Sequence, residues 1–359
     1  MSRARFRGCA AIVASALVAL LAPGAAAACG AFFASEVEVD PDQEIVVMHR
    51  GGVETYVFRP RFCGAATDFG VILPIPATLA SNPALADAAL FDDLARYTEP
   101  TVEEVCEGGS VGCIGGAAGA DGPPPPGFGT GVDVIDQGRV GIFSWTLLQA
   151  TSSAAFTDWL TTKGFPYDAS GDAAYAHYVD AGWYFVAFEV STGAAAPPPG
   201  MALCGDLGPI QLSFASPSPV IPARITDVNA VGSPAPRWRI AVLAAGEQRV
   251  EPGGSFVGAR WFSGTLQQAA LDGYPALKAA SLEGERLTVL DVAFPGTGAT
   301  GDILLANAPY PSDFRSVRHV AKDCGGCQAG GAPMGMAGAA AALALLRAGR
   351  RGRRRGQGS

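Results

Sequence analysis

The sequence predicts a β-rich α+β fold: a single exported domain with a few short helices, flanked by an N-terminal signal peptide and a C-terminal transmembrane or sorting helix. Two observations support this prediction. Most apolar runs are short, rich in β-branched or aromatic residues, and bounded by Gly, Pro, Asn or Asp, as strands are. Only three segments have the residue spacing of helices. The 359 residues are 49% hydrophobic, which is enough to form a packed core.

The first 28 residues have the three parts of a secretory signal peptide. Three arginines within the first seven residues precede an apolar run from Cys9 to Ala22, and small residues follow up to Ala28. The run is too short to span about 30 Å of hydrocarbon, so we expect cleavage near Ala28. Acylation of Cys29, as in a lipoprotein, is an alternative, although Ala26 occupies the place where such signals carry a large aliphatic residue.

Short apolar runs predict the strands of the body, which we expect to form one domain from residue 29 to 320. These runs lie at 44–50, 53–58, 69–76, 131–136, 139–150, 183–191, 209–214, 223–228, 237–245, 286–294 and 302–308. Two inserts, 115–131 and 193–200, contain proline runs. Because proline cannot donate the hydrogen bonds of a sheet, we expect both inserts to be exposed loops.

Three segments of the body predict helices. The first follows Asn82 and Pro83 and continues through residue 98, with apolar residues on one face at Leu85, Ala88, Ala89 and Phe91.

The second begins near Ser152, with Phe156, Trp159 and Leu160 spaced to pack together, and Gly164 ends it. The third runs from Asp172 to Asp180 and is closed by Gly182.

The charge of the body is strongly acidic. Nine of the 25 basic residues are arginines in segments 1–28 and 332–359, which contain no Asp, Glu or Lys, so 16 basic residues accompany 33 acidic ones in the rest of the chain. An acidic surface repels phosphate backbones and anionic lipid surfaces. We therefore expect no nucleic acid among the partners.

Four stretches of the body resemble a family of exported bacterial proteins classed as a domain of unknown function, number 2330. They are "ACGAFF", "FGVILPIP" followed by "LFDDLARYTEPTVEE", "FTDWLTTKGFPYDASGDAAYAHYVDAGWYFVAFEV", and "PIQLSFASPSPVIPARITDVNA". The resemblance covers most of the chain. It implies kinship with that family and carries no activity, cofactor or site residue with it.

Cysteines in an oxidising compartment are disulfide candidates. Cys106 and Cys113 enclose the short glycine-rich loop "EGGSVG", and this pairing is our first choice. Cys63 and Cys204 could pair with each other, or Cys29 could pair with either, because connectivity cannot be deduced from sequence.

No motif predicts a catalytic residue, a cofactor or a metal site. Residues 108–112 match the Gly-x-Ser-x-Gly nucleophile elbow, but an acidic segment precedes them and a proline-rich segment follows, where an elbow needs a strand and a helix. His49, His177 and His319 have no second ligand at zinc spacing. The acidic pairs at 92–93 and 103–104 lack the pattern of a calcium loop, and we expect them on a solvated face.

The C-terminal segment suggests how the protein is attached. A spacer at 321–331 with Cys324 and Cys327 precedes an apolar segment at 332–346 and an arginine-rich tail at 347–359. The apolar segment is close to the minimum length of a membrane helix, and its arginines would stay in the cytoplasm.

This order of elements resembles the myxobacterial C-terminal sorting signal (MYXO-CTERM). The resemblance implies cleavage near the cysteines and surface attachment through a modified cysteine, Cys327 more than Cys324. A simple membrane anchor that is never cleaved is the alternative.

The sequence thus predicts a cell-envelope or surface-anchored protein, with a binding or structural role favoured over an enzymatic one. The membrane and an envelope glycan or protein are the expected partners. An extracytoplasmic, hydrolase-like enzyme with an unrecognised site remains the alternative. Tryptophans are used by sugar-binding sites, but those in strands more often belong to the core; they are Trp145, Trp159, Trp183, Trp238 and Trp261.

Overall fold

The computed structural model describes the part of the chain that forms the fold. The described residues are 31–33, 37–39, 43–59, 61–64, 70–106, 131–165, 169–190, 203–206, 208–229, 236–252, 254–294 and 299–322. They divide into a main unit and a small unit that contains most of the two-stranded ribbon of β8 (Thr101–Cys106) and β21 (Val317–Lys322). The predicted signal peptide, the apolar segment 332–346 and the tail 347–359 lie outside the described residues.

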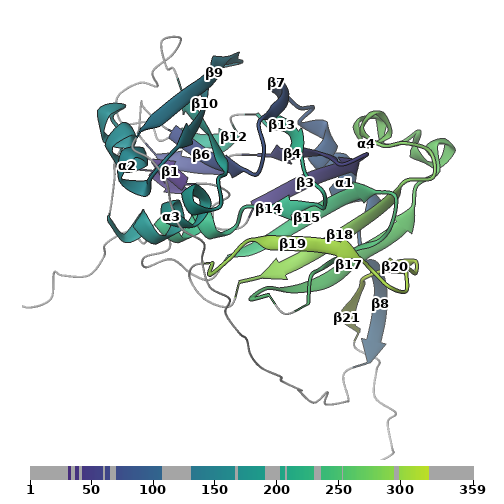
Figure 1. Ribbon diagram of the computed structural model, residues 1–359. Coiled ribbons are helices and arrows are strands. Elements are labelled where there is room, and N and C mark those ends of the chain that lie inside the picture. The colour runs from purple at the N-terminus through teal and green to yellow at the C-terminus, as the bar shows by residue number, and fades with distance from the viewer. Residues whose placement is uncertain are drawn as a thin grey trace, which may run out of the picture. The chain divides into compact units, whose positions relative to one another are not determined.

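An eight-stranded sheet is the largest element of the main unit (Figure 1). Neighbouring strands are antiparallel except for β3 and β15, which run parallel to each other, with Ile45 opposite Ile240. In spatial order they are β20 (Phe314–Arg315), β17 (Val257–Thr265), β18 (Arg286–Ala293), β15 (Arg237–Ala244), β3 (Gln43–Arg50), β4 (Val53–Phe58), β13 (Ile210–Ala215) and β7 (Leu79–Leu85).

A second, five-stranded antiparallel sheet packs against one face of the first. In spatial order its strands are β1 (Ala31–Phe33), β6 (Gly70–Ile75), β11 (Tyr184–Val190), β10 (Phe143–Ala150) and β9 (Val132–Val140). The largest hydrophobic core lies between the two sheets, where Val47 and Tyr56 of the larger sheet share a cluster with Val71 and Phe188 of the smaller one. Burial of this apolar surface is the main stabilising contribution.

Helices cover the outer faces of both sheets. The helices α2 (Ser153–Thr162) and α3 (Asp172–Asp180) pack on the five-stranded sheet through a cluster that includes Phe156 and Tyr175 (Figure 1). The helices α1 (Ala89–Tyr97) and α4 (Pro275–Ala280) pack on the eight-stranded sheet through Leu94 and Leu277. Both faces of the central strands are therefore buried.

Smaller elements complete the main unit. One three-stranded sheet has the order β12 (Leu203–Asp206), β5 (Arg61–Gly64) and β2 (Val37–Val39). Another has the order β14 (Val220–Ile221), β19 (Ile303–Asn307) and β16 (Gln248–Val250). Three short 3-10 helices are η1 (Ala169–Gly171), η2 (Arg224–Asn229) and η3 (Gln268–Leu271).

The predicted β-rich α+β class is confirmed, and most of the predicted strands are present. The strand predicted at 223–228 is wrong, because η2 occupies this segment. The Arg224 amide donates to Asp302 Oδ1 at 3.1 Å, and the Thr226 hydroxyl donates to the Ala223 carbonyl at 2.7 Å. These bonds fold the backbone into a turn and remove it from any ladder.

The second and third predicted helices are present as α2 and α3. Ser152 caps α2, since its side chain accepts from the Ala155 amide at 3.1 Å. Gly164 and Gly182 follow the two helices with φ of +82° and +71°, a conformation that glycine adopts without strain.

The first predicted helix starts too early. Residues 79–85 form β7, the edge strand of the larger sheet, and α1 begins only at Ala89, whose amide donates to Asp87 Oδ1 at 2.9 Å. An edge strand tolerates Pro83 because one side of the strand needs no ladder bonds. Leu85, predicted to pack from the helix, is 51% exposed.

No helix within the described residues combines the length and the apolar character needed to cross a membrane.

Candidate ligand-binding pocket

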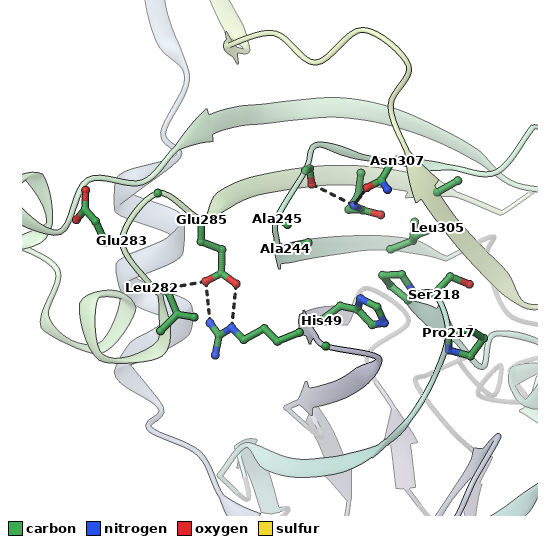
Figure 2. A pocket seen from close by; sticks show the side chains of 17 residues that line it. His49, Pro217, Ser218, Ala244, Ala245, Leu282, Glu283, Glu285, Leu305 and Asn307 are labelled. Atoms are coloured by element: carbon green, nitrogen blue, oxygen red, sulfur yellow. Dashed lines mark hydrogen bonds and ion pairs between the residues drawn. The ribbon is translucent and has the colours of Figure 1, made fainter.

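A cavity of about 560 Å³ opens at one end of the eight-stranded sheet (Figure 2). The ends of β3, β15 and β19 form its walls together with two turns, at 217–219 and 282–285. A cavity of this size is in the usual range for small-molecule sites.

The β3–β4 hairpin brings two functional side chains to the cavity. Its turn is Gly51-Gly52, with φ of +59° and +77°, the conformation that two-residue hairpin turns require and glycine favours. The Ser216 amide donates to the Gly52 carbonyl at 2.9 Å and holds the turn against the end of β13. His49 and Arg50 therefore line the cavity at a fixed position.

Arg50 and Glu285 form an ion pair at the wall of the cavity. Arg50 donates to both oxygens of Glu285, at 2.9 and 2.7 Å, and also to the Ala280 carbonyl at 2.7 Å. Glu285 further accepts from the Leu282 amide at 3.0 Å. This two-bond geometry is the strong form of an Arg–carboxylate pair. Arg50 is thus held by the wall of the cavity, and its charge is compensated there.

Two amide side chains form a polar edge on the opposite side. Gln248 Nε2 donates to Asn307 Oδ1 at 2.6 Å and to the Gly246 carbonyl at 3.0 Å. The Gln248 backbone amide donates to Thr288 Oγ1 at 3.0 Å. A carboxamide carries two donors on its nitrogen, so the Asn307 nitrogen stays available as a donor among the described residues.

His49 completes the polar groups of the cavity. Its Nε2 lies 2.9 Å from the Ser216 carbonyl, and because a carbonyl only accepts, Nε2 is the donor. In the neutral ring Nδ1 is then an acceptor. The Ser216 hydroxyl itself donates to the Ser218 carbonyl at 2.6 Å. Both side chains are thus engaged with backbone carbonyls of the 216–218 turn, and they do not form a Ser–His nucleophile pair.

A buried carboxyl lies next to this site. Glu54 is directly opposite His49 in the β3–β4 pairing and is fully buried. Its Oε2 accepts from the Val220 amide at 3.0 Å, whereas Oε1 has no partner among the described residues. Burial raises the pKa of Glu54 to about 8, and the hydrogen bond from the Val220 amide offsets this only in part. Glu54 is therefore mainly protonated and uncharged at pH 7.

Comparisons with known proteins identify the family. The model of an uncharacterised protein family conserved in bacteria (DUF2330) matches residues 23–305. The chain belongs to this family. No curated protein matches it. Among solved structures, the crystal structure of baculovirus P35 is similar with a TM-score of 0.33 at 9% identity, over 78% of this chain and 99% of that chain.

The cysteines predicted to be important are only partly within the described residues of this DUF2330 chain. Cys63 is in β5 and Cys204 is in β12, and the two are directly opposite each other in the pairing of these strands. Cys106 is the last residue of β8. The remaining cysteine candidates lie outside the described residues, as does the 108–112 motif; they are Cys29, Cys113, Cys324 and Cys327.

The three histidines have different surroundings. His49 lines the cavity, whereas His177 is on α3 with its Nε2 3.3 Å from Asp302 Oδ2. His319 is in β21, 3.9 Å from Glu103. Within the described residues, no group of three or more His, Cys, Asp or Glu side chains could hold a metal ion.

The prediction of a solvated acidic pair at 92–93 is wrong for Asp93, which is 2% exposed. Asp93 Oδ2 accepts from the Ala276 and Leu277 amides at 2.8 and 3.1 Å, and Oδ1 accepts from Arg96 at 2.5 Å. This carboxylate therefore caps the N-terminus of α4 from the neighbouring helix α1.

The tryptophans belong to the packing of the DUF2330 body. Trp145 and Trp238 are buried in the core between the sheets, and Trp159 and Trp183 pack on the cluster beneath α2 and α3. Trp261 packs on the other face of the larger sheet, where the Arg239 guanidinium lies 3.9 Å from the centre of its ring.

Glu54, next to the site, is a residue that the sequence analysis did not single out. The signal was the two-residue period of the strand "VETYVF". Because alternate residues of a strand point to the same face, Glu54 lies on the face of Tyr56 and Phe58. A glutamate in register with two large apolar residues on a strand indicates a buried carboxyl.

Proposed function

We propose that this DUF2330 protein is a cell-envelope protein whose exported body binds an uncharged, hydroxyl-rich ligand, such as an envelope glycan, in the cavity beside His49. Segment 1–28 would direct export, and segment 332–346 would anchor the protein or be removed during attachment through Cys327 or Cys324. The partners in this proposal are therefore the membrane and a glycan.

The charge balance of the cavity supports an uncharged ligand. Arg50 and Glu285 compensate each other, and Glu54 is mainly neutral at pH 7. The exposed Glu283 carboxylate at the cavity accepts from the neutral Gln268 amide at 2.7 Å, and it disfavours an anionic ligand. A charged ligand would have to compete with these interactions, and a neutral one would not.

The donors and acceptors of the cavity support a ligand rich in hydroxyl groups. Asn307 offers nitrogen donors and His49 offers a ring acceptor. A hydroxyl can donate and accept at once, so it can satisfy both kinds of group. This pairing of complementary groups around a neutralised ion pair is the observation that carries the proposal.

Binding is favoured over hydrolysis because the groups that could react already have structural roles. His49 holds the Ser216 carbonyl, and the Ser216 hydroxyl holds the Ser218 carbonyl. A serine hydrolase would need one of them to be a base or a nucleophile toward the substrate. A glycosidase would instead need a pair of carboxyl groups, and of the carboxyl groups at the cavity Glu285 is held by Arg50.

Binding can be tested with the full protein extracted from its native envelope. We expect retention on an array of neutral envelope glycans, and an affinity weaker by about five- to thirtyfold for the Asn307→Ala variant, since a lost hydrogen bond costs about 1 to 2 kcal/mol. The matched control is Asn82→Ala, an exposed residue of β7 that does not line the cavity, which should bind like the wild type. Absence of retention, or equal loss in both variants, would refute the proposed site, and release of a cleaved glycan would favour the hydrolase.

Attachment can be tested on the same preparation by intact mass and C-terminal peptide analysis. We expect the mature protein to start near Cys29 and to lack the arginine tail. Recovery of unmodified peptides through Arg347 as the major species would exclude processing and leave the simple anchor.

A further inference from the structure

Two cysteines far apart in the sequence are direct neighbours in the three-stranded sheet of β12, β5 and β2. In the antiparallel pairing of β12 with β5, Cys204 is opposite Cys63, Leu203 is opposite Gly64, and Gly205 is opposite Phe62. On its other side, Cys63 is opposite Glu38 of β2. Cys204 is thus the cysteine that the strand register places next to Cys63.

This register matches the geometry of a disulfide. Residues directly opposite each other in antiparallel strands have Cα atoms about 4.5 to 5.5 Å apart, and disulfides join Cα atoms about 4.4 to 6.8 Å apart. The Cα atoms of this pair are therefore at a separation that a disulfide can span.

We propose that Cys63 and Cys204 form a disulfide that joins β5 to β12. This inference rests on the export that is part of the proposed function, because disulfides persist in oxidising compartments outside the cytoplasm. It resolves the alternatives that the sequence leaves open, in which either cysteine could pair with Cys29.

The oxidant is a disulfide donor of the envelope, such as the active-site disulfide of a thiol oxidase. The thiolate of one cysteine attacks the donor disulfide and forms a mixed disulfide, and one donor thiol leaves. The second cysteine then attacks its partner's sulfur and releases the other donor thiol. The two cysteines lose two electrons and two protons in total, and the donor disulfide is reduced to a dithiol.

The bond would stabilise the pairing of two short strands, β5 and β12. β5 and β12 have only four residues each, near the lower end of the usual strand length. A disulfide that closes a loop of roughly 140 residues strongly restricts the unfolded chain, which stabilises the folded state.

Tryptic digestion separates this bond from all other pairings. Cleavage after Arg61, Arg96, Lys163 and Arg224 gives peptides 62–96 and 164–224, each with a single cysteine. Cys106 and Cys113 both fall in peptide 97–139, so their bond would stay within one peptide. Cys29 falls in the peptide that ends at Arg50. Each alternative connectivity therefore has its own mass.

The experiment is non-reducing peptide mapping of the full protein from its native envelope, with free thiols alkylated before digestion. We expect a species that joins peptides 62–96 and 164–224, lighter than their sum by two hydrogen atoms and split by reduction. Alkylation of both cysteines, or a link from either one to the Cys29 peptide, in protein that has lost its signal peptide would overturn the disulfide while leaving export intact. Free thiols in protein that retains residues 1–28 would overturn both the disulfide and the proposed export.

Variants supply a second readout. Cys63→Ser and Cys204→Ser should each abolish the linked species and lower the melting temperature, and the double variant should melt like the reduced wild type. Cys106→Ser is the matched control and should leave the 62–96/164–224 species unchanged. A double variant that melts like the oxidised wild type would contradict the bond. If the single variants fail to accumulate, the wild-type peptide map decides alone.

Discussion

Two buried carboxyl groups lie on opposite faces of the eight-stranded sheet, and they differ in the number of hydrogen bonds that they accept. Asp93, at the junction of α1 and α4, accepts from two backbone amides and one arginine. Glu54, beside the cavity, accepts from the Val220 amide with one oxygen and has no partner for the other among the described residues. Both residues are at most 2% exposed.

The difference shows which buried polar group supports the fold and which one costs stability. A carboxylate with all its bonds made can remain charged inside a protein, whereas one without partners becomes protonated or destabilises the fold. Asp93 therefore holds two helices together. Glu54 is retained next to the cavity despite a cost in stability, and such groups concentrate at functional sites.

The largest expected effect is on the pH dependence of stability, and it comes from Glu54. Its pKa is raised from 4.5 to about 8 in the folded protein, so between these values the native state binds a proton that the unfolded state has lost. Stability should therefore fall as pH rises from 5 to 8, by on the order of 3 kcal/mol from this group. Glu54→Gln should remove this part of the pH dependence, as measured by urea unfolding at several pH values.

The control for this measurement is Asp133→Asn, which changes an exposed carboxyl on β9. This variant should keep the wild-type slope of stability against pH. An unchanged slope in Glu54→Gln would show that Glu54 is ionised in the folded protein, and the contrast with Asp93 would then be lost.

A smaller effect is expected from Asp93. Asp93→Ala leaves the Ala276 and Leu277 amides without their acceptor and should destabilise the protein by about 2 kcal/mol, because buried donors would lose their partner. Urea unfolding followed by tryptophan fluorescence measures this loss. Asp92→Ala, on the exposed neighbour, should change stability by less than about 0.5 kcal/mol. Equal losses in the two variants would rule out the capping role.

The sequence was informative where one local rule determined the outcome. Ser152 begins α2 and Gly164 follows its end, as expected, because capping and positive φ are properties of single residues. Asn82 and Pro83 misled the prediction, since they obey the helix-start rule but lie in an edge strand paired with β13. Edge position is set by the whole sheet and is invisible in a local window.

The candidate site could be predicted less well than the fold. Its residues come from positions near 50, 217, 245, 284 and 306, and only the strand order brings these together. The pairing of Cys63 with Cys204 is similar, because two cysteines can be counted in the sequence but their register depends on how β5 meets β12. Glu54 alone had a readable signal, in the alternation of its strand.

The smallest expected effect concerns a single carboxylate, Asp302. It tests whether the loss of a partner costs more for a buried group than for an exposed one. On its buried side, Asp302 Oδ1 accepts from the Tyr178 hydroxyl at 2.5 Å, and that hydroxyl in turn accepts from the Ile225 amide at 3.0 Å. On its outer side, Oδ2 lies 3.3 Å from His177, whose side chain is 40% exposed. Tyr178→Phe should cost about 1.5 kcal/mol, because it leaves the buried Ile225 amide without its acceptor and removes one of the two donors to Asp302 Oδ1, the other being the Arg224 amide. His177→Ala should cost less than about 0.5 kcal/mol, because water replaces an exposed contact. Urea unfolding of both variants at pH 7 measures the two losses. If His177→Ala cost as much as Tyr178→Phe, the number of partners lost by buried groups would not determine the energetics of these carboxylates, and the contrast between Asp93 and Glu54 would need another explanation.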